Sequence, residues 1–466
     1  MKRTETDARE TAVVRAPHDG SEVGVYPLAG PEEVRAALAA NTAAARACRD
    51  MPAYERAAAL RRVADALVAE KESLARTLAL EAGKPISQAR TEIDRATSVF
   101  RDGAAEATRL EGELLPADAV PTGAGRIALA RRFPLAPIAA ITPFNFPLLL
   151  AAHKLAPAMA CGASITLKPP PQDPLTTLRL GELIWGSGYP DGGVRIVPCH
   201  VEVAQILIDD PRVRMITFTG SARAGWAIRA KAGTKRVALE LGGNAGVIVA
   251  ADADLDWAAV RCAIGGFTYA GQSCISTQRI YVHESVYQPF LDLFVPKVRA
   301  LKVGDVLDDQ VEVGPLISLD AAERVERWMQ EAVTAGAQVV TGGKRTGAYF
   351  EPTVLTHTSP EMKVNCEEVF APLVTVTPFR KIEDAIAAVN DSTYGLQAGV
   401  FTRDLQTMFG AWAELDVGGV NGNDIPGYRV DRLPYGGAKA SGLGREGVHY
   451  AIQEMTELRL LTLKLS

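Results

Sequence analysis

The chain has 466 residues, of which 47% are hydrophobic and 23% are charged, and its formal net charge is −5. At roughly 100–200 residues per domain this length predicts about two to four folding units, and the composition is that of a globular protein rather than a disordered or fibrous one. A charge so close to neutral offers no strongly basic surface, so neither nucleic acid nor a membrane is expected as a partner.

The N-terminus and the cysteines predict the cellular compartment of the protein. Met1–Glu5 continues into mixed charge without an apolar stretch, so no secretory signal is expected. The six cysteines form no CxxC pair and have no histidine cluster beside them, which predicts neither a disulfide framework nor a metal site. We therefore expect a cytoplasmic protein with reduced thiols.

Helical periodicity dominates residues 31–112, where apolar side chains recur at spacings of three and four. A hairpin is expected at 114–133, because turn residues precede the alternation in Arg126–Arg132. Residues 133–152 carry no charge, and a stretch of that length could span a membrane. Its four prolines would break a helix, so a buried strand, a loop and a helix start are predicted instead.

Short apolar strands alternate with helices across residues 137–218. This pattern is typical of a parallel sheet covered on both faces, and it predicts a doubly wound, Rossmann-like α/β unit that binds a nucleotide. A second α/β region is expected over residues 237–433, with helices at 257–270 and 287–301. The final alternating stretch, Arg459–Leu465, predicts a terminal strand whose free edge pairs with another subunit.

Two glycine-rich segments compete as phosphate sites. The literal GxGxxG at Gly442, Gly444 and Gly447 follows no apolar strand and has only nineteen residues after it, too few for a dinucleotide-binding βαβ unit, so it is interpreted as a turn. Phe218–Ser221 instead ends an apolar strand and begins a helix. Free amides and a hydroxyl at that point suit a pyrophosphate, although the same pattern also serves as an ordinary helix cap.

Two further segments place reactive groups among apolar or small residues. Glu240 lies in an apolar strand, where a carboxylate is costly to desolvate and is either paired or kept for acid–base chemistry. Cys274 follows a helix among small residues that let a substrate approach. Because free cysteines are more often buried filler than nucleophiles, this segment alone also fits a structural role.

Several motifs occur together in a fixed order: Pro143–Pro147, Leu167–Pro169, Phe218–Ser221, Glu240–Asn244, Gly271–Cys274 and Glu367–Pro372. In order and spacing they resemble the aldehyde dehydrogenase superfamily. The likeness covers nearly the whole chain and is closest to the lactaldehyde-dehydrogenase-like branch, which shares the Tyr428–Asp431 type of segment. It implies an α/β fold with a Rossmann-like cofactor domain, a second α/β catalytic domain and a small β element for oligomerisation.

The resemblance also implies domain boundaries. Residues 1–113 and 134–238 would form the NAD(P)-binding domain, and residues 239–434 the catalytic domain. Residues 114–133 and 447–466 would form the oligomerisation element. A homodimer or homotetramer is therefore expected.

The catalytic roles are implied in the same way. Cys274 would attack the aldehyde as a thiolate, because an aldehyde gives up hydride readily only after a nucleophile has added. The side-chain amide of Asn145 and the backbone N–H of Cys274 would stabilise the oxyanion, and Glu240 would activate water to hydrolyse the thioester. Lys154 and Glu446 match positions proposed to relay protons, and a structural ion pair explains them equally well.

The cofactor contacts implied are Lys168 at the adenosine ribose, Gly220 and Ser221 at the pyrophosphate, Glu368 and Phe370 at the nicotinamide ribose, and Thr142, Pro143, Phe144, Leu241 and Gly242 nearby. Many NAD-preferring relatives carry a glutamate three residues after the lysine, and this chain has Pro171 there. Without that carboxylate a 2′-phosphate is not repelled. We therefore expect NAD⁺ to be favoured or comparable and NADP⁺ to be accepted.

The implied substrate pocket contains Phe146, Ser273, Ile275 and Tyr428, with Ser276 in the loop that shapes it. Arg101 sits where relatives that act on phosphorylated or phosphonate aldehydes place a basic contact. Those relatives tend to carry a second arginine just before the nucleophile, where this chain has Ser273. A surface salt bridge is therefore the alternative role for Arg101.

Two other functions are compatible with this fold. A CoA-acylating dehydrogenase resolves its thioester with CoA, but relatives of that kind generally lack the glutamate seen here as Glu240. A non-enzymatic binding protein would be expected to have lost Cys274, Asn145 or Glu240, and all three are present. The favoured function is NAD(P)-dependent oxidation of a small aldehyde to a carboxylic acid.

Overall fold

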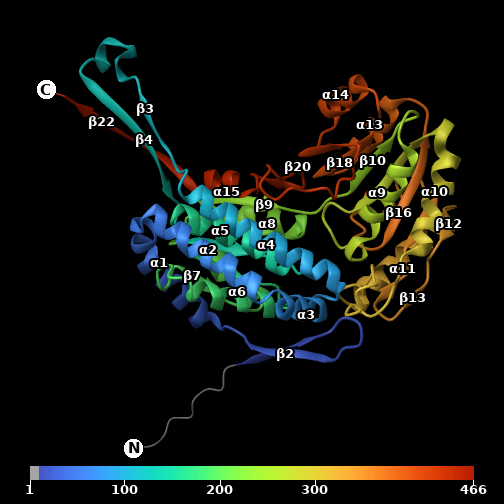
Figure 1. Cartoon of the computed structure of the whole chain (residues 1–466), viewed down its shortest axis with the longest axis horizontal. Helices are drawn as coiled ribbons and strands as arrows, with labels where there is room; N and C mark the ends of the chain where they lie inside the picture. Colours follow the sequence, from blue (N-terminus) through green and yellow to red (C-terminus); the bar gives the residue numbers. More distant parts are fainter. Residues whose placement is uncertain (1–9, 466) are drawn as a thin grey trace, which may run out of the picture.

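The computed structural model describes residues 10–465, so the N-terminal residues behind the prediction about secretion lie outside the described part. Two large sheets, one six-stranded and one seven-stranded, form two halves of the molecule, and a three-stranded ribbon projects from the first half (Figure 1). The predicted α/β fold with a doubly wound sheet, a second α/β unit and a small β element is confirmed. No helix within residues 10–465 is long and apolar enough to cross a bilayer.

The six-stranded sheet has the order β21-β9-β8-β5-β6-β7, and all its neighbouring strands are parallel except β21 and β9. Because β9 pairs with β8, the strand that carries Glu240 belongs to this sheet, and the interpretation that a second α/β region begins at Val237 is wrong. Gly442 of the GxGxxG segment pairs with Glu240 as a short return strand. The strands are β5 (Ile138–Ile141), β6 (Ile165–Lys168), β7 (Val194–Ile196), β8 (Met215–Thr219), β9 (Arg236–Glu240) and β21 (Gly442–Leu443).

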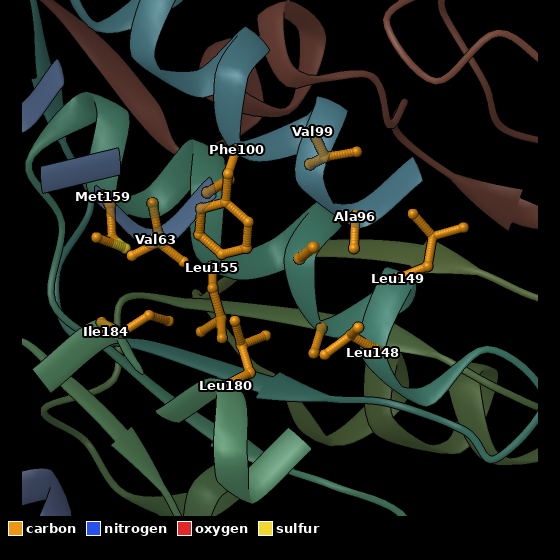
Figure 2. Packing of buried hydrophobic residues seen from close by; sticks show 14 of the residues in the cluster. Val63, Ala96, Val99, Phe100, Leu148, Leu149, Leu155, Met159, Leu180 and Ile184 are labelled. Atoms are coloured by element: carbon orange, nitrogen blue, oxygen red, sulfur yellow. The ribbon is translucent and has the colours of Figure 1, made fainter. Parts of the chain in front are cut away.

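Helices cover this sheet on both sides, and the main core lies where they pack together. Figure 2 shows Phe100 among Val63, Leu155 and Met159, all of which are fully buried. Helix α5 is buried along its whole length, as expected for a helix that is apolar on every side. The covering helices are α1 (Pro31–Asp50), α2 (Ala53–Ala69), α3 (Lys71–Ala82), α4 (Ile86–Ala107), α5 (Pro147–Cys161), α6 (Leu175–Trp185), α7 (Val201–Asp209), α8 (Ala222–Lys231) and α15 (Val448–Glu454).

The seven-stranded sheet has the order β12-β15-β16-β11-β10-β18-β19 and is parallel except where β12 meets β15. Its strands are β10 (Ala245–Val249), β11 (Thr277–His283), β12 (Gln338–Thr341), β15 (Thr353–Thr356), β16 (Leu373–Phe379), β18 (Gln397–Phe401) and β19 (Gly419–Gly422). Its helices are α9 (Leu255–Phe267), α10 (Tyr287–Ala300), α11 (Leu319–Thr334), α12 (Lys363–Cys366), α13 (Ile382–Asn390) and α14 (Leu405–Glu414).

The projecting ribbon joins distant parts of the chain, because β4 (Arg126–Pro134) pairs antiparallel with both β3 (Gly112–Leu115) and β22 (Thr456–Lys464). Its outer strand β22 exposes several leucines to solvent. Helix α15, just before β22, packs against α4 and α5 of the main body. The short pairs are β1 (Thr11–Arg15) with β2 (Glu22–Pro27), β13 (Arg345–Thr346) with β14 (Tyr349–Phe350), and β17 (Tyr394–Gly395) with β20 (Ala438–Lys439).

Candidate active site

One cavity of about 640 Å³ is lined by residues from both halves of the molecule. It brings together Asn145, Glu240 and Cys274, which lie far apart in the sequence. The sequence-predicted residues that line it are Pro143, Phe144, Asn145, Phe146, Gly220, Ser221, Glu240, Leu241, Gly242, Ser273, Cys274, Ile275, Glu368, Phe370 and Glu446, and Ser276 lines it as well.

Other sequence-predicted residues do not line this cavity. Thr142 and Lys168 are buried at the ends of their strands. Lys154 is buried next to Glu446, and its Nζ lies 3.6 Å from Oε1 of that residue. Tyr428 is exposed. Arg101 is also exposed and lines a separate surface hollow between α2 and α4.

Arg95, six residues before Arg101 on α4, lines the cavity, whereas Arg101 does not. At 3.6 residues per turn, six positions rotate a helix by about 240°, so the two arginines of α4 face different directions. Gln88, Thr91 and Glu92 share the face of Arg95 and also line the cavity. The helix that the resemblance indicated therefore meets the cavity through Arg95 and not through Arg101, and the sequence pattern gave no sign of Arg261, Arg429 or Tyr435 as cavity residues.

The loop before Cys274 has an unusual backbone. Tyr269, Ala270 and Gly271 have consecutive positive φ values of 49°, 51° and 69°, so the helix predicted to reach residue 270 ends at Phe267. A Cβ on Gly271 would lie 2.2 Å from the carbonyl oxygen of Ala371, which excludes any other residue there. This strained turn places Cys274 half-buried in the cavity.

The thiol of Cys274 contacts one hydroxyl. Its Sγ lies 3.0 Å from Oη of Tyr435. Burial raises the pKa of the Cys274 thiol to about 12, and the hydrogen bond from Tyr435 opposes that rise. The free protein therefore holds this group mainly as a thiol at neutral pH.

Asn145 is held by contacts on both its side chain and its backbone. Its side-chain amide donates to the carbonyl of Gln272 at 3.1 Å, and its own carbonyl accepts from Nζ of Lys84 at 2.8 Å. Lys84 forms an ion pair with Glu92, and both side chains are fully buried. Glu92 in turn accepts from the first two free amides of α5, each at 3.1 Å. We call this pair the Lys84–Glu92 clamp, because it ties helices α4 and α5 to the backbone of Asn145.

Glu240 faces a buried charge network. Glu446 accepts from Arg429 at 3.1 Å and lies near Lys154. Burial on its own would raise the pKa of Glu446, but nearby cations, Lys154 and Arg429 among them, lower it to about 2. Burial and the charge of Glu446 raise the pKa of Glu240 well above its usual range, and Oε2 of Glu240 has no hydrogen-bond partner in the described chain. The Glu446 carboxyl is thus kept ionised, and the Glu240 carboxyl is kept basic.

The ends of strands β6 and β8 offer groups that fit a dinucleotide. Ser221 caps α8 through its hydroxyl, which accepts from the amide of Ala224 at 3.4 Å. Oγ1 of the neighbouring Thr219 is buried without a partner among residues 10–465, and Nζ of Lys168 makes no hydrogen bond there either. A helix N-terminus, an unsatisfied hydroxyl and an ammonium group match the pyrophosphate and ribose of NAD(P).

The residues around Gly242, Glu368 and Phe370 are closely packed. A Cβ on Gly242 would lie 2.4 Å from Oε2 of Glu368, so a larger residue there would displace the Glu368 carboxylate. Glu368 accepts from the amide of Gly243 at 2.9 Å, and burial raises the pKa of Glu368 to about 7. Phe370, at a positive φ of 52°, stands edge-on to Phe144 at 5.9 Å between ring centres. This carboxylate and these rings suit a nicotinamide riboside.

A doubly wound sheet beside a cavity that holds a thiol, an amide and a basic carboxylate defines an NAD(P)-dependent dehydrogenase. The comparison with known families agrees. The chain belongs to the aldehyde dehydrogenase family, whose model matches residues 4–461.

Similar proteins span almost the whole chain. The 3-sulfolactaldehyde dehydrogenase of Priestia aryabhattai is 46% identical over 413 residues, covering 88% of this chain and 87% of that protein. The lactaldehyde dehydrogenase of Methanocaldococcus jannaschii is 38% identical and covers 97% of each chain. Aldehyde dehydrogenase 21 from Physcomitrella patens, solved with the reaction product succinate, superposes with a TM-score of 0.97 at 40% identity, covering 99% of this chain and 96% of that one.

Proposed function

We propose that this chain oxidises a short aldehyde with an anionic far end to a carboxylic acid, with Cys274 as nucleophile, Asn145 as oxyanion donor and Glu240 as base. The observation that carries the proposal is the meeting of these three side chains in one cavity beside a dinucleotide site. Lys168, Ser221 and Glu368 would hold NAD⁺ or NADP⁺. When bound, that cofactor supplies the hydride acceptor.

In the first half of the reaction, Sγ of Cys274 bonds to the aldehyde carbon and the carbonyl oxygen becomes an oxyanion. The amide of Asn145 and the backbone N–H of Cys274 stabilise that charge, which is the role of preorganised donors in acyl transfer. Because the Lys84–Glu92 clamp fixes the backbone of Asn145, the donor need not be ordered during the reaction. The adduct then loses hydride and becomes a thioester on Cys274.

In the second half, Glu240 takes a proton from water as the water attacks the thioester carbon. A general base is most effective when its pKa lies near the working pH, and burial moves Glu240 in that direction. Collapse of the second tetrahedral adduct releases the acid and restores Cys274. Lys154 and Glu446 would pass the proton on from Glu240.

Two arginines support an anionic substrate. Arg95 donates to Asp431 at 2.7 and 2.8 Å, and Nε of Arg261 donates to Asp424 at 2.6 Å. Each lines the cavity, and Nη1 of Arg95 and both Nη atoms of Arg261 make no hydrogen bond within the described residues. Free guanidinium N–H groups recognise carboxylate, sulfonate or phosphate. The names of the relatives support this class, since they include a sulfolactaldehyde enzyme and a complex with succinate.

The proposed assembly is a homodimer or homotetramer in the cytoplasm. The leucines exposed on β22 support pairing between subunits, and the six free cysteines support a reducing compartment. Residues 1–113 with 134–238 would bind the cofactor, 239–434 would carry catalysis, and 114–133 with 447–466 would assemble the subunits. Light scattering at micromolar concentration tests the assembly, and a monomer would contradict it.

Absorbance of the reduced cofactor tests the reaction. Purified protein should oxidise succinate semialdehyde with NAD⁺ or NADP⁺ at a rate that CoA does not change, and Cys274→Ala should abolish the rate. A strict requirement for CoA would indicate the acylating alternative. No turnover with any aldehyde would indicate a binding protein.

The substrate class has its own test. Arg261→Gln should lower kcat/KM for succinate semialdehyde about tenfold relative to butanal, which has the same carbon chain without the charge. Arg101→Gln is the matched control, because Arg101 lies outside the cavity. An unchanged ratio in Arg261→Gln and in Arg95→Gln would refute the anionic class.

A further inference from the structure

The hydroxyl of Tyr435 has an unusual position for a tyrosine in an apolar pocket. Tyr435 packs with Ile275 and Leu396 around Cys274, and it is 4% exposed. Its Oη lies 3.0 Å from Sγ of Cys274 and is the sole hydrogen-bond partner of that sulfur within residues 10–465. A phenylalanine would fill the same space, so packing alone does not explain the hydroxyl group.

Tyr435 is held rigidly. Its amide donates to the carbonyl of Glu446 at 3.1 Å, and its carbonyl accepts from the amide of Glu446 at 2.6 Å. The guanidinium of Arg429 lies over its ring, 3.7 Å from the centre. Arg429 is itself fixed by its ion pair with Glu446. The backbone and the ring stacking therefore determine where the hydroxyl lies before any substrate arrives.

The direction of the hydrogen bond follows from the chemistry of the two groups. Burial, followed by the nearby Cys274, raises the pKa of Tyr435 well above its usual range, so the hydroxyl keeps its proton. Once Cys274 is a thiolate, its sulfur is only an acceptor and the hydroxyl must donate. A donor that favours the charged form lowers the pKa of that group.

The other groups around Cys274 show why a donor matters. Burial and the carboxyls of Glu240 and Glu368 all raise the pKa of the thiol. Arg429, whose guanidinium lies over the ring of Tyr435, lowers it through its positive charge. Tyr435 is thus the neutral group that opposes burial without adding a charge to the site.

We propose that Tyr435 is a positioning residue whose hydroxyl donates to Sγ of Cys274, fixing the sulfur in the cavity and stabilising its thiolate. The proposal rests on the proposed function, in which Cys274 is the nucleophile. No bond to Tyr435 forms or breaks, and the proton lost from Cys274 goes to solvent.

The test measures the acidity of the thiol without aldehyde or cofactor. Free enzyme is alkylated with iodoacetamide across pH 6 to 11, and the modified Cys274 peptide is quantified by mass spectrometry, which separates it from the exposed Cys366. In Tyr435→Phe the alkylation rate at every pH below the pKa of the thiol should fall about tenfold, which corresponds to a rise of about one unit in that pKa. An unchanged or faster rate would overturn the proposal.

A matched control and a second variant keep the test decisive. Tyr189→Phe removes another buried hydroxyl, which donates to the carbonyl of Ala163 at 2.9 Å outside the cavity, and it should leave the alkylation rate of Cys274 unchanged. If Tyr435→Phe fails to fold, 3-fluorotyrosine at position 435 keeps every contact with a stronger donor. The alkylation rate should then rise, and a fall or no change would overturn the proposal. Loss of activity in Cys274→Ala tests the nucleophile separately.

Discussion

Removing Lys84 should show how much the Lys84–Glu92 clamp contributes to the free energy of unfolding and to kcat. In Lys84→Met the buried Glu92 loses its counter-ion, and the carbonyl of Asn145 loses its donor. Breaking one partner of a buried ion pair typically costs about 3–5 kcal/mol. Because both side chains are fully buried, we expect the upper part of that range for the first unfolding transition. Loosening Asn145 by about 1 Å should also lower kcat about 10²-fold.

The double variant separates charge from packing. In Lys84→Met/Glu92→Gln neither charge of the clamp remains, and the glutamine oxygen can still accept from the first amides of α5. We therefore expect the double variant to be more stable than the sum of the single changes by about 1–3 kcal/mol. Urea unfolding followed by tryptophan fluorescence gives the four free energies of the cycle, and steady-state kinetics gives kcat for each variant.

An exposed ion pair provides the control. Arg380 and Glu284 are 2.8 Å apart but lie in solvent, with side chains 80% and 49% exposed, so Glu284→Gln should leave the unfolding midpoint unchanged. Additive free energies within about 0.5 kcal/mol would refute the coupling within the clamp. A normal kcat in Lys84→Met would refute the claim that it positions Asn145.

Three further predictions concern chemistry and cofactor. Glu240→Gln should keep a burst of reduced cofactor in stopped-flow absorbance and slow the later turnovers by about 10²–10⁴. The wild-type rate of these turnovers should rise with pH as the raised pKa of Glu240 is passed, and the variant should lose that rise. Pro171→Glu should lower kcat/KM for NADP⁺ about tenfold relative to NAD⁺, because two negative charges then meet, and an unchanged ratio would place the 2′-phosphate elsewhere. Since the pKa of Glu368 is about 7, KM for the cofactor should rise as pH falls below that value, and a Glu368→Gln variant with the same pH profile would contradict this.

The sequence predicted the fold class well because its signals are local. Short apolar strands between helices specify a parallel sheet, and the structure has that sheet over residues 137–240. The β1–β2 hairpin was missed, since its strands are short and only half-buried. Alternation at Val237 suggests the start of a second region, although the strand completes the first sheet, because sequence alternation does not reveal which neighbour a strand pairs with.

The residues of the candidate site also fall into those that the sequence reveals and those that only the structure reveals. Asn145, Glu240 and Cys274 stand in contiguous motifs that the sequence alone makes visible, and their catalytic roles stay predictions. Arg95 and Tyr435 do not stand out in the sequence, because their places in the cavity depend on the three-dimensional structure. For Arg95 the rotation of α4 decides which side chain meets the cavity. For Tyr435 the decisive contact joins residues 161 positions apart.

The pairing of β22 with β4 has a consequence for biosynthesis. Thr456 lies opposite Pro134, and the ladder runs on to Lys464 at the end of the described chain. A ribosome therefore exposes β4 long before its partner strand leaves the exit tunnel. Until β22 emerges, the nascent chain presents an open strand edge, which is the kind of surface that aggregates or recruits chaperones. The synthesis of β22 thus decides when the first half of the protein is finished.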